Sequence, residues 1–326
     1  MDRRRFLAGA VAVVGVSALE RSGVRMWPEA EDGSISAARA WTASIRTMYW
    51  RGEPAGMVHN LLVHHAAELD AAVGDAPSSA VMAGLLRAEA EALAVAGTVA
   101  YFDMGRYGAA HRELKNAMRC ARHSDDMRMC GWIFAKQSHL AWCQHNKDDA
   151  ILTANAALEY TQANPLASAD VFTRRAVAHA MDGNEAAALR DIDNAAEAAS
   201  DATPADTPDW LIGFDSARVA GLAGLVRLTL GQPQEAVTEL RRALTVDVAG
   251  NHAAVLSADL ATGLGRIGEP DEGARTLFPV LPVAATSHSV ERRARLQTAW
   301  RTLQPANTPA TRALRDQLRT YRLIAA

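Results

Sequence analysis

The chain has 326 residues, of which 49% are hydrophobic and 22% are charged, a balance that excludes disordered, fibrous and collagen-like proteins. The formal net charge is −3, from 34 basic and 37 acidic residues, which disfavours an overall basic nucleic-acid-binding protein. Alanine occurs 68 times and aromatic residues make up only 6% of the chain, so the composition favours helices over sheets.

Residues 1–30 form an Arg-rich apolar N-terminal segment with two competing interpretations. The apolar run from Phe6 to Leu19 is too short for a bilayer, which needs about 20 apolar residues, but it fits the core of a signal peptide. Arg3, Arg4, Phe6 and Leu7 match the twin-arginine export motif. The alternative is a short apolar helix that docks on the body of the protein.

Residues 31–287 contain a recurring pattern of two helical stretches joined by a short turn, which often contains glycine. The clearest copy lies at residues 93–121, at offsets occupied by Tyr101, Gly105, Tyr107, Ala110, Leu114 and Ala117. Further copies are centred on Gly183, Gly231 and Gly268, and one has His145 where the glycine would stand. Glycine adopts the left-handed conformation that ends a helix, and the small residues that follow let two helices approach closely. Such pairs cannot bury their apolar faces alone, so we expect them to stack into a solenoid.

Two proline-marked breaks interrupt the pattern. Residues 200–208 are rich in proline and small polar residues and predict a loop, after which residues 208–210 predict the start of a helix. Residues 304–309 predict a second break, before a final helix at residues 310–324. Residues 288–326 carry eight arginines against two carboxylates, and we expect them to form basic capping helices. This basic charge is either a solvated face or a surface that orients a partner.

This repeat pattern resembles the tetratricopeptide repeat (TPR) family over most of the chain. The resemblance implies an all-α, right-handed superhelical solenoid of about six helix pairs. More narrowly, Asp2 to Leu7 and Met48 to Gly52 look like segments of bacterial regulators that join a helix-turn-helix domain to degenerate TPR repeats. This chain resembles such a sensory region without the DNA-binding domain, so we expect no direct DNA binding.

The motifs that would indicate a cofactor or a metal have simpler explanations. Residues 263–268 match G-x-G-x-x-G, but dinucleotide binding needs a preceding strand, and residues 253–262 predict a helix. Cys130 and Cys143 lie thirteen residues apart on one predicted helix, about 20 Å, too far to share a zinc ion. We therefore expect no metal and no cofactor. No catalytic constellation stands out by spacing, which favours a protein that is not an enzyme.

The concave groove gives the sharpest functional hypothesis. In the TPR family the first helix of each repeat lines the groove, and this frame selects Trp132, Lys136, His139 and Trp142, then Asp170 and Arg174, then Arg218. Aromatic surface beside a cation-rich stripe suits a peptide carboxylate or a small acidic effector. The competing interpretation is that the two tryptophans only pack between repeats.

The sequence therefore predicts a non-catalytic regulatory protein that binds a peptide, a small effector or a partner protein in its groove. A twin-arginine-exported scaffold of the cell envelope is the first alternative, and a pathway enzyme on a helical-repeat scaffold is the second. We expect a cytoplasmic protein, with export as the alternative, and no transmembrane span. The oligomeric state is left open.

Overall fold

A computed structural model of the protein describes residues 32–203, 207–211, 214–245, 250–287 and 289–324. The N-terminal segment with Arg3, Arg4, Phe6 and Leu7 lies outside these residues, so both interpretations of it stay predictions. Within the described ranges every regular element is a helix, which confirms the all-α fold. No helix among them is both long and apolar enough to cross a membrane.

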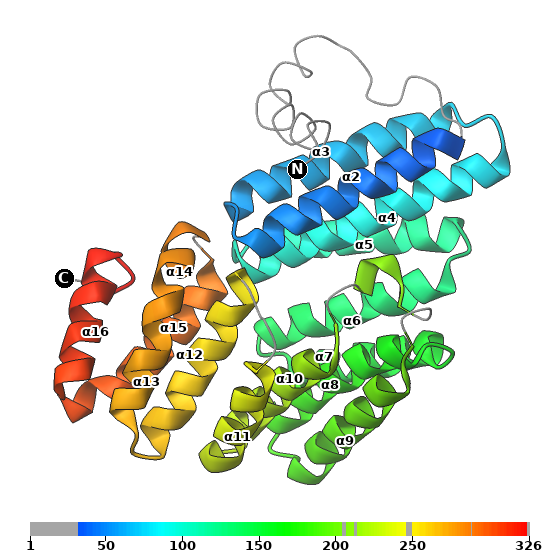
Figure 1. The fold of residues 1–326 in the computed structure, drawn as a ribbon. Helices are drawn as coiled ribbons and strands as arrows, with labels where there is room; N and C mark the ends of the chain where they lie inside the picture. Colours follow the sequence, from blue (N-terminus) through cyan, green and yellow to red (C-terminus); the bar gives the residue numbers. More distant parts are fainter. Residues whose placement is uncertain (1–31, 204–206, 212–213, 246–249, 288, 325–326) are drawn as a thin grey trace.

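The described part of the chain starts with three long helices that pack together, α2 (Asp32–Arg51), α3 (Ala55–Gly74) and α4 (Ser79–Phe102). Successive antiparallel pairs follow. Their members are α4 with α5 (Tyr107–His123), α6 (Met127–Cys143) with α7 (Lys147–Thr161), α8 (Pro165–Met181) with α9 (Glu185–Asp201), α10 (Ser216–Thr229) with α11 (Pro233–Ala243), and α12 (Gly250–Arg266) with α13 (Pro270–Leu277). Figure 1 shows these pairs stacked side by side along a curved array, as in a solenoid.

The turn within each pair explains why the sequence folds into hairpins of helices. Gly105, Gly183, Gly231 and Gly268 all have a positive φ, between 63° and 86°, directly after the first helix of a pair. His145 holds the same position between α6 and α7 with a φ of 58°, so it takes the place of the glycine as the spacing predicts. A left-handed residue at this point reverses the chain and lets the carbonyls at the helix end find partners.

Small residues set the distance between the two helices of a pair. A Cβ built on Gly224 of α10 would lie 2.4 Å from Cγ of Leu240 on α11, and one built on Gly97 of α4 would lie 2.9 Å from Cγ of Leu114 on α5. These contacts are too close for any larger residue without a shift, so glycine is needed for the helices to pack at this separation.

The C-terminal part differs from the expected cap in two ways. After α14 (Leu281–Ser287), helix α15 (Val290–Leu303) packs along α12, and its first turn reaches back to the end of α4, where the amide of Val290 donates to the carbonyl of Asp103 (2.8 Å). Two arginines of α15 are buried rather than solvated. The last helix, α16, spans Pro309–Thr320, so it ends before the predicted residue 324 because a left-handed Arg322 follows.

The loop after α9 also differs from the prediction. Residues 208–210 do not begin the next α-helix; Asp209–Leu211 form a single 3-10 turn, η2, and α10 begins at Ser216. The side chain of Asp215 caps the N-terminus of α10, because its carboxylate accepts a hydrogen bond from the amide of Arg218 (2.9 Å). The prediction missed this because Pro208 restricts only the residues beside it and gives no amphipathic period.

Candidate functional site

The curved array encloses a cavity of about 1230 Å³, a volume that includes the space at its open mouth. The first helices of the pairs, α4, α6, α8, α10 and α12, each contribute side chains to its wall. Helices α2 and α15, which lie far apart in the sequence, also contribute to the wall. The 3-10 turn η2 adds Trp210 and Leu211. An open cavity lined by aromatic and charged side chains of several helices is typical of a site for a small molecule or a short peptide.

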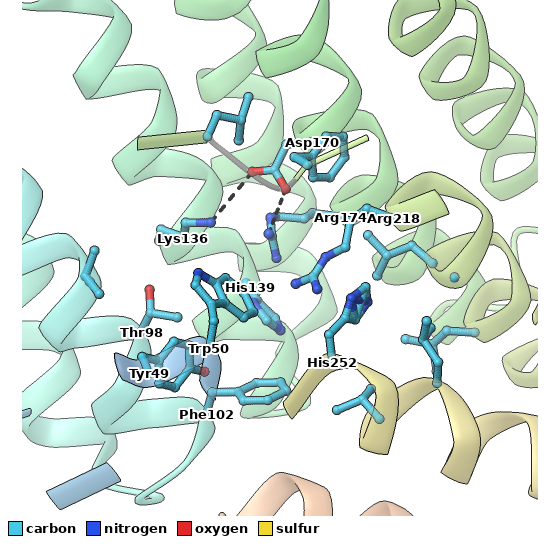
Figure 2. Close-up of a pocket in the computed structure, with 18 of the residues that line it drawn as sticks. Tyr49, Trp50, Thr98, Phe102, Lys136, His139, Asp170, Arg174, Arg218 and His252 are labelled. Atoms are coloured by element: carbon cyan, nitrogen blue, oxygen red, sulfur yellow. Dashed lines mark hydrogen bonds and ion pairs between the residues drawn. The ribbon is translucent and has the colours of Figure 1, made fainter. Parts of the chain in front are cut away.

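All seven predicted groove residues line this one cavity. They are Trp132, Lys136, His139 and Trp142 from α6, Asp170 and Arg174 from α8, and Arg218 from α10. Figure 2 shows Lys136, Arg174 and Arg218 extending toward a shared space, with His139 between them and α2. The TPR frame thus identified the correct helix faces. Whether these residues bind a ligand stays a proposal.

Several lining residues were missed by the sequence reasoning because they lie outside the repeat frame. Tyr49 and Trp50 come from α2, Trp210 from η2 and His252 from the first turn of α12. Trp50 is 38% exposed, which places it at the rim, and the guanidinium of Arg218 lies 5.6 Å from its ring centroid. Tyr49 and Trp50 lie in the segment 48–52, which carries a family resemblance, and Trp210 lies in residues 208–210, which predict a helix start; neither signal indicates a binding site.

Aromatic rings form one side of the site. The rings of Trp132 and Trp210 lie 5.1 Å apart at a 35° tilt, and the ammonium of Lys136 lies 5.0 Å from the Trp132 ring centroid. His139 stacks on Trp142 with a centroid distance of 4.5 Å. Both tryptophans of α6 line the cavity and also contact the hydrophobic core, so they pack between repeats, and a contact with a ligand stays a proposal.

The cationic side is organised around one buried carboxylate. Asp170, only 1% exposed, accepts a hydrogen bond from Arg174 (2.7 Å) and has the Lys136 ammonium 3.8 Å away. Burial opposes ionisation of Asp170, but Arg174 and then Lys136 outweigh it and hold the pKa of its carboxyl below the usual range. Asp170 is therefore charged and orients the two cations beside it.

Burial also sets the charge of the neighbouring bases. It lowers the pKa of Lys136 to about 7, with Asp170 opposing the shift and Arg174 and Arg218 adding to it. Burial and the same cations lower the pKa of His139 well below its usual range, and burial with Arg218 lowers that of His252 to about 2. Both imidazoles are therefore neutral at neutral pH, while Lys136 changes charge close to it.

The wall carries a surplus of positive charge at this point. Three other lining arginines have carboxylate partners: Arg46 with Glu91 (2.6 Å), Arg292 with Asp103 (2.7 Å), and Arg295 with Asp259 and Glu291. By contrast Lys136 and Arg174 share Asp170, Arg218 lies near this group without an ion pair to a described residue, and the exposed Asp215 caps α10. With Lys136 protonated, the group of Lys136, Arg174, Arg218 and Asp170 has two more positive than negative charges, whereas Arg295 with Asp259 and Glu291 has one more negative than positive.

Unused hydrogen-bond donors accompany this charge. Among the described residues, Nε1 of Trp132, Nε of Arg174 and Nε2 of His139 are buried without a hydrogen-bond partner. The Tyr101 hydroxyl lies 2.9 Å from Nδ1 of His139 and can donate to it, which leaves the imidazole proton on Nε2. Buried donors without partners are rare in proteins, and their clustering beside a cavity is typical of a ligand site.

The motifs for metals and nucleotides have no such support. In the part of the chain that the structure describes, no three His, Cys, Asp or Glu side chains come together as a metal site. Burial raises the pKa of Cys120 and Cys143 to about 12, so both thiols stay protonated. The glycines of residues 263–268 lie in and after α12, where Gly263 and Gly265 allow close contact with Val237 and Thr302.

Comparison with known proteins supports the fold alone. No family model matches the sequence, and no curated protein matches it. Chains of solved structures do match, 42 of them, and one is a Rap protein in complex with Competence and Sporulation Factor. This chain is similar to that Rap protein with a TM-score of 0.50 and 11% sequence identity, over 89% of this chain and 88% of that chain. The likeness agrees with an all-α, TPR-like fold, and the narrower resemblance to sensory regions of DNA-binding regulators stays a prediction.

Proposed function

We propose that this protein is a non-catalytic regulatory protein of the TPR type that binds an anionic ligand in its central cavity. The observation that carries the proposal is the group Lys136, Arg174 and Arg218, which meets a single buried carboxylate beside aromatic rings and unused donors. Charge-assisted hydrogen bonds from such cations are the strong interactions that hold carboxylates and phosphates in proteins. A short peptide or a small acidic effector can offer an anionic group to the cations and a surface that contacts the aromatic rings.

The position of the cations favours these two ligands over a folded partner protein, because Lys136, Arg174 and Arg218 lie inside the cavity wall instead of on an outer face. The Rap protein of similar fold was solved with Competence and Sporulation Factor, which supports regulatory recognition as the class of function. At 11% identity it does not supply the ligand.

Signalling follows from the geometry of the wall. Ligand contacts would span α6, α8 and α10, and the wall is closed by α2 and α15, which lie far apart in the sequence. A ligand that binds one curvature of the solenoid better than another shifts the population toward it. We propose that this change is what a partner protein reads, and that the protein acts in the cytoplasm without contacting DNA directly.

The experiment is native mass spectrometry of the protein purified from the cells that make it. We expect a non-covalent ligand mass that is lost in Arg218→Gln and kept in Arg293→Gln, a matched change at an exposed arginine of α15. A bound mass that both variants keep would place the ligand outside the cavity and contradict the proposal.

The same spectrum tests the two alternatives. Loss of about the first 18 residues, where Val16-Ser17-Ala18 offers small residues for cleavage, would favour the exported scaffold. Conversion of the bound compound during incubation would favour the pathway enzyme. A full-length chain with an unchanged ligand is the result that the regulatory proposal expects.

A further inference from the structure

We infer that the ligand carries two negative charges at one end, which the α6–α8–α10 wall holds between Lys136, Arg174 and Arg218, and a flat apolar part that lies against the tryptophans. This inference rests on the proposed function and specifies the chemical class of the ligand. The two negative charges belong to one phosphate monoester or to two neighbouring carboxylates.

The number of charges follows from the charge balance of the wall. Arg174 is 5% exposed and donates one hydrogen bond to Asp170, while its Nε has no partner among the described residues. Arg218 has no ion pair with a described residue, and its guanidinium lies over the Trp50 ring. While Lys136 is protonated, a monoanion would leave one positive charge of the group Lys136, Arg174, Arg218 and Asp170 uncompensated, and an uncompensated buried charge is costly. A dianion neutralises this group with Lys136 in its ammonium form.

The charge of the cavity wall depends on pH through Lys136. The charged groups that face its ammonium are Asp170 and Arg174 from α8 and Arg218 from α10, and neutral His139 is its neighbour on α6. Burial lowers its pKa to about 7 in the empty cavity, so at pH 8 about nine in ten molecules carry a neutral amine there. An arriving dianion favours the ammonium form and raises this pKa.

Binding is therefore coupled to proton uptake in a stated pH range. Because the pKa of Lys136 is about 7 without ligand and higher with it, the complex takes up about 0.9 proton at pH 8 and about 0.1 at pH 6. Affinity for the dianion consequently falls as pH rises above 7. Carboxylates are ionised in this range, whereas the second pKa of a phosphate monoester is about 6, so at pH 6 a phosphate monoester releases about half a proton when it binds as the dianion.

The flat apolar part is argued from the rings around the cations. Trp132, Trp210 and Phe102 line the same cavity, and the Trp50 ring stands at its rim. Because Trp132 already packs against Trp210 and the Lys136 ammonium, a planar group would stack on Trp210, Phe102 or Trp50 while its anionic end reaches the α8 wall. Phenyl phosphate and phthalate have this form with a phosphate and with two carboxylates, and benzoate is the matched monoanion.

The experiment is isothermal titration calorimetry of the full chain with these three probes, in buffers of different ionisation enthalpy at pH 6 and pH 8. We expect one or both dianions to bind at least about tenfold more tightly than benzoate, with proton uptake at pH 8. At pH 6 we expect almost no uptake with phthalate and a net proton release with phenyl phosphate, whose second pKa is about 6. Preference for phenyl phosphate would assign a phosphate monoester, and preference for phthalate would assign paired carboxylates.

Two variants test whether Lys136 and Arg218 cause the proton uptake and the preference for dianions. Lys136→Arg keeps the charge and should abolish the proton uptake while binding persists, and Arg218→Gln should remove most of the preference for dianions. Arg293→Gln should behave as the parent. Equal binding of benzoate and the dianions, absence of dianion binding, or an unchanged preference in Arg218→Gln would overturn the inference. A neutral or singly charged ligand in the native mass spectrum would overturn it while leaving the proposed function intact.

Discussion

The ion pair between Arg292 and Asp103 joins the two ends of the solenoid, and its removal should loosen that closure. The two residues are 189 positions apart, their side chains are 3% and 0% exposed, and Nη2 of Arg292 lies 2.7 Å from Oδ1 of Asp103. Replacing Arg292 by methionine keeps much of the side-chain volume but leaves a buried carboxylate without its cation. Breaking such a pair from one side costs about 3–5 kcal/mol.

The expected loss of stability can be measured by urea unfolding followed by far-UV circular dichroism. With a slope of about 3 kcal/mol per molar urea, the midpoint of Arg292→Met should fall by about 1–1.7 M. Arg293→Met, one residue away and exposed, is the control and should shift the midpoint by less than about 0.3 M. A midpoint for Arg292→Met no lower than that of Arg293→Met would refute the reasoning.

The pH dependence of the variant adds a second check with a definite sign. Burial raises the pKa of Asp103, and Arg292 is the strongest group that opposes this shift. Without Arg292 the folded-state pKa rises further above the unfolded value, so the variant loses stability as pH rises from about 4 toward that pKa. The gap between parent and variant should therefore be smaller at pH 4 than at pH 7, and adding Asp103→Asn should recover part of the loss at pH 7.

Three further changes test the fold. His145→Gly should raise the free energy of unfolding by about 0.5–1 kcal/mol, because His145 holds a left-handed conformation in an exposed turn; a loss of stability would contradict this. Gly224→Ala should lower it by about 1–3 kcal/mol through its contact with Leu240, whereas Gly108→Ala on the open face of α5 should not destabilise; equal effects would contradict the packing argument. His65 is buried with a pKa of about 4, so unfolding takes up its proton and stability falls by about 3 kcal/mol as pH drops from 6.5 to 4. His65→Gln should flatten that fall in denaturation curves taken across this range, and an unchanged fall would exclude His65 as the cause.

The repeat architecture could be predicted from sequence because its determinants are local. A left-handed residue after each first helix and a small residue near the start of each second helix recur at fixed offsets, and both act within one hairpin. His145 shows that the offsets carried more information than the residue type. The groove residues of α6, α8 and α10 followed from the same frame, because a repeat fixes which face of the first helix points inward.

The parts that escaped prediction depend on contacts between distant segments. Trp50, Trp210 and His252 reach the cavity from α2, η2 and the start of α12, and no local pattern specifies that these segments meet. The buried role of Arg292 and Arg295 in a helix that looked like a basic cap has the same origin, since their partners Asp103 and Asp259 belong to α4 and α12. The excess positive charge around Lys136, Arg174 and Arg218 could be recognised only once the structure showed that the other lining arginines have carboxylate partners.

The central claim is that the α6–α8–α10 cavity is the binding site, and the scarcity of lysine makes a direct test simple. The chain has three lysines, Lys115, Lys136 and Lys147, so amine acetylation at pH 8 can be followed at each one by peptide mass spectrometry. Adding the small-molecule and peptide fraction of the cells that make the protein should slow acetylation of Lys136 about tenfold or more and leave the exposed Lys115 unchanged. Acetylation of Lys136 at the same rate with and without that fraction would contradict the claim.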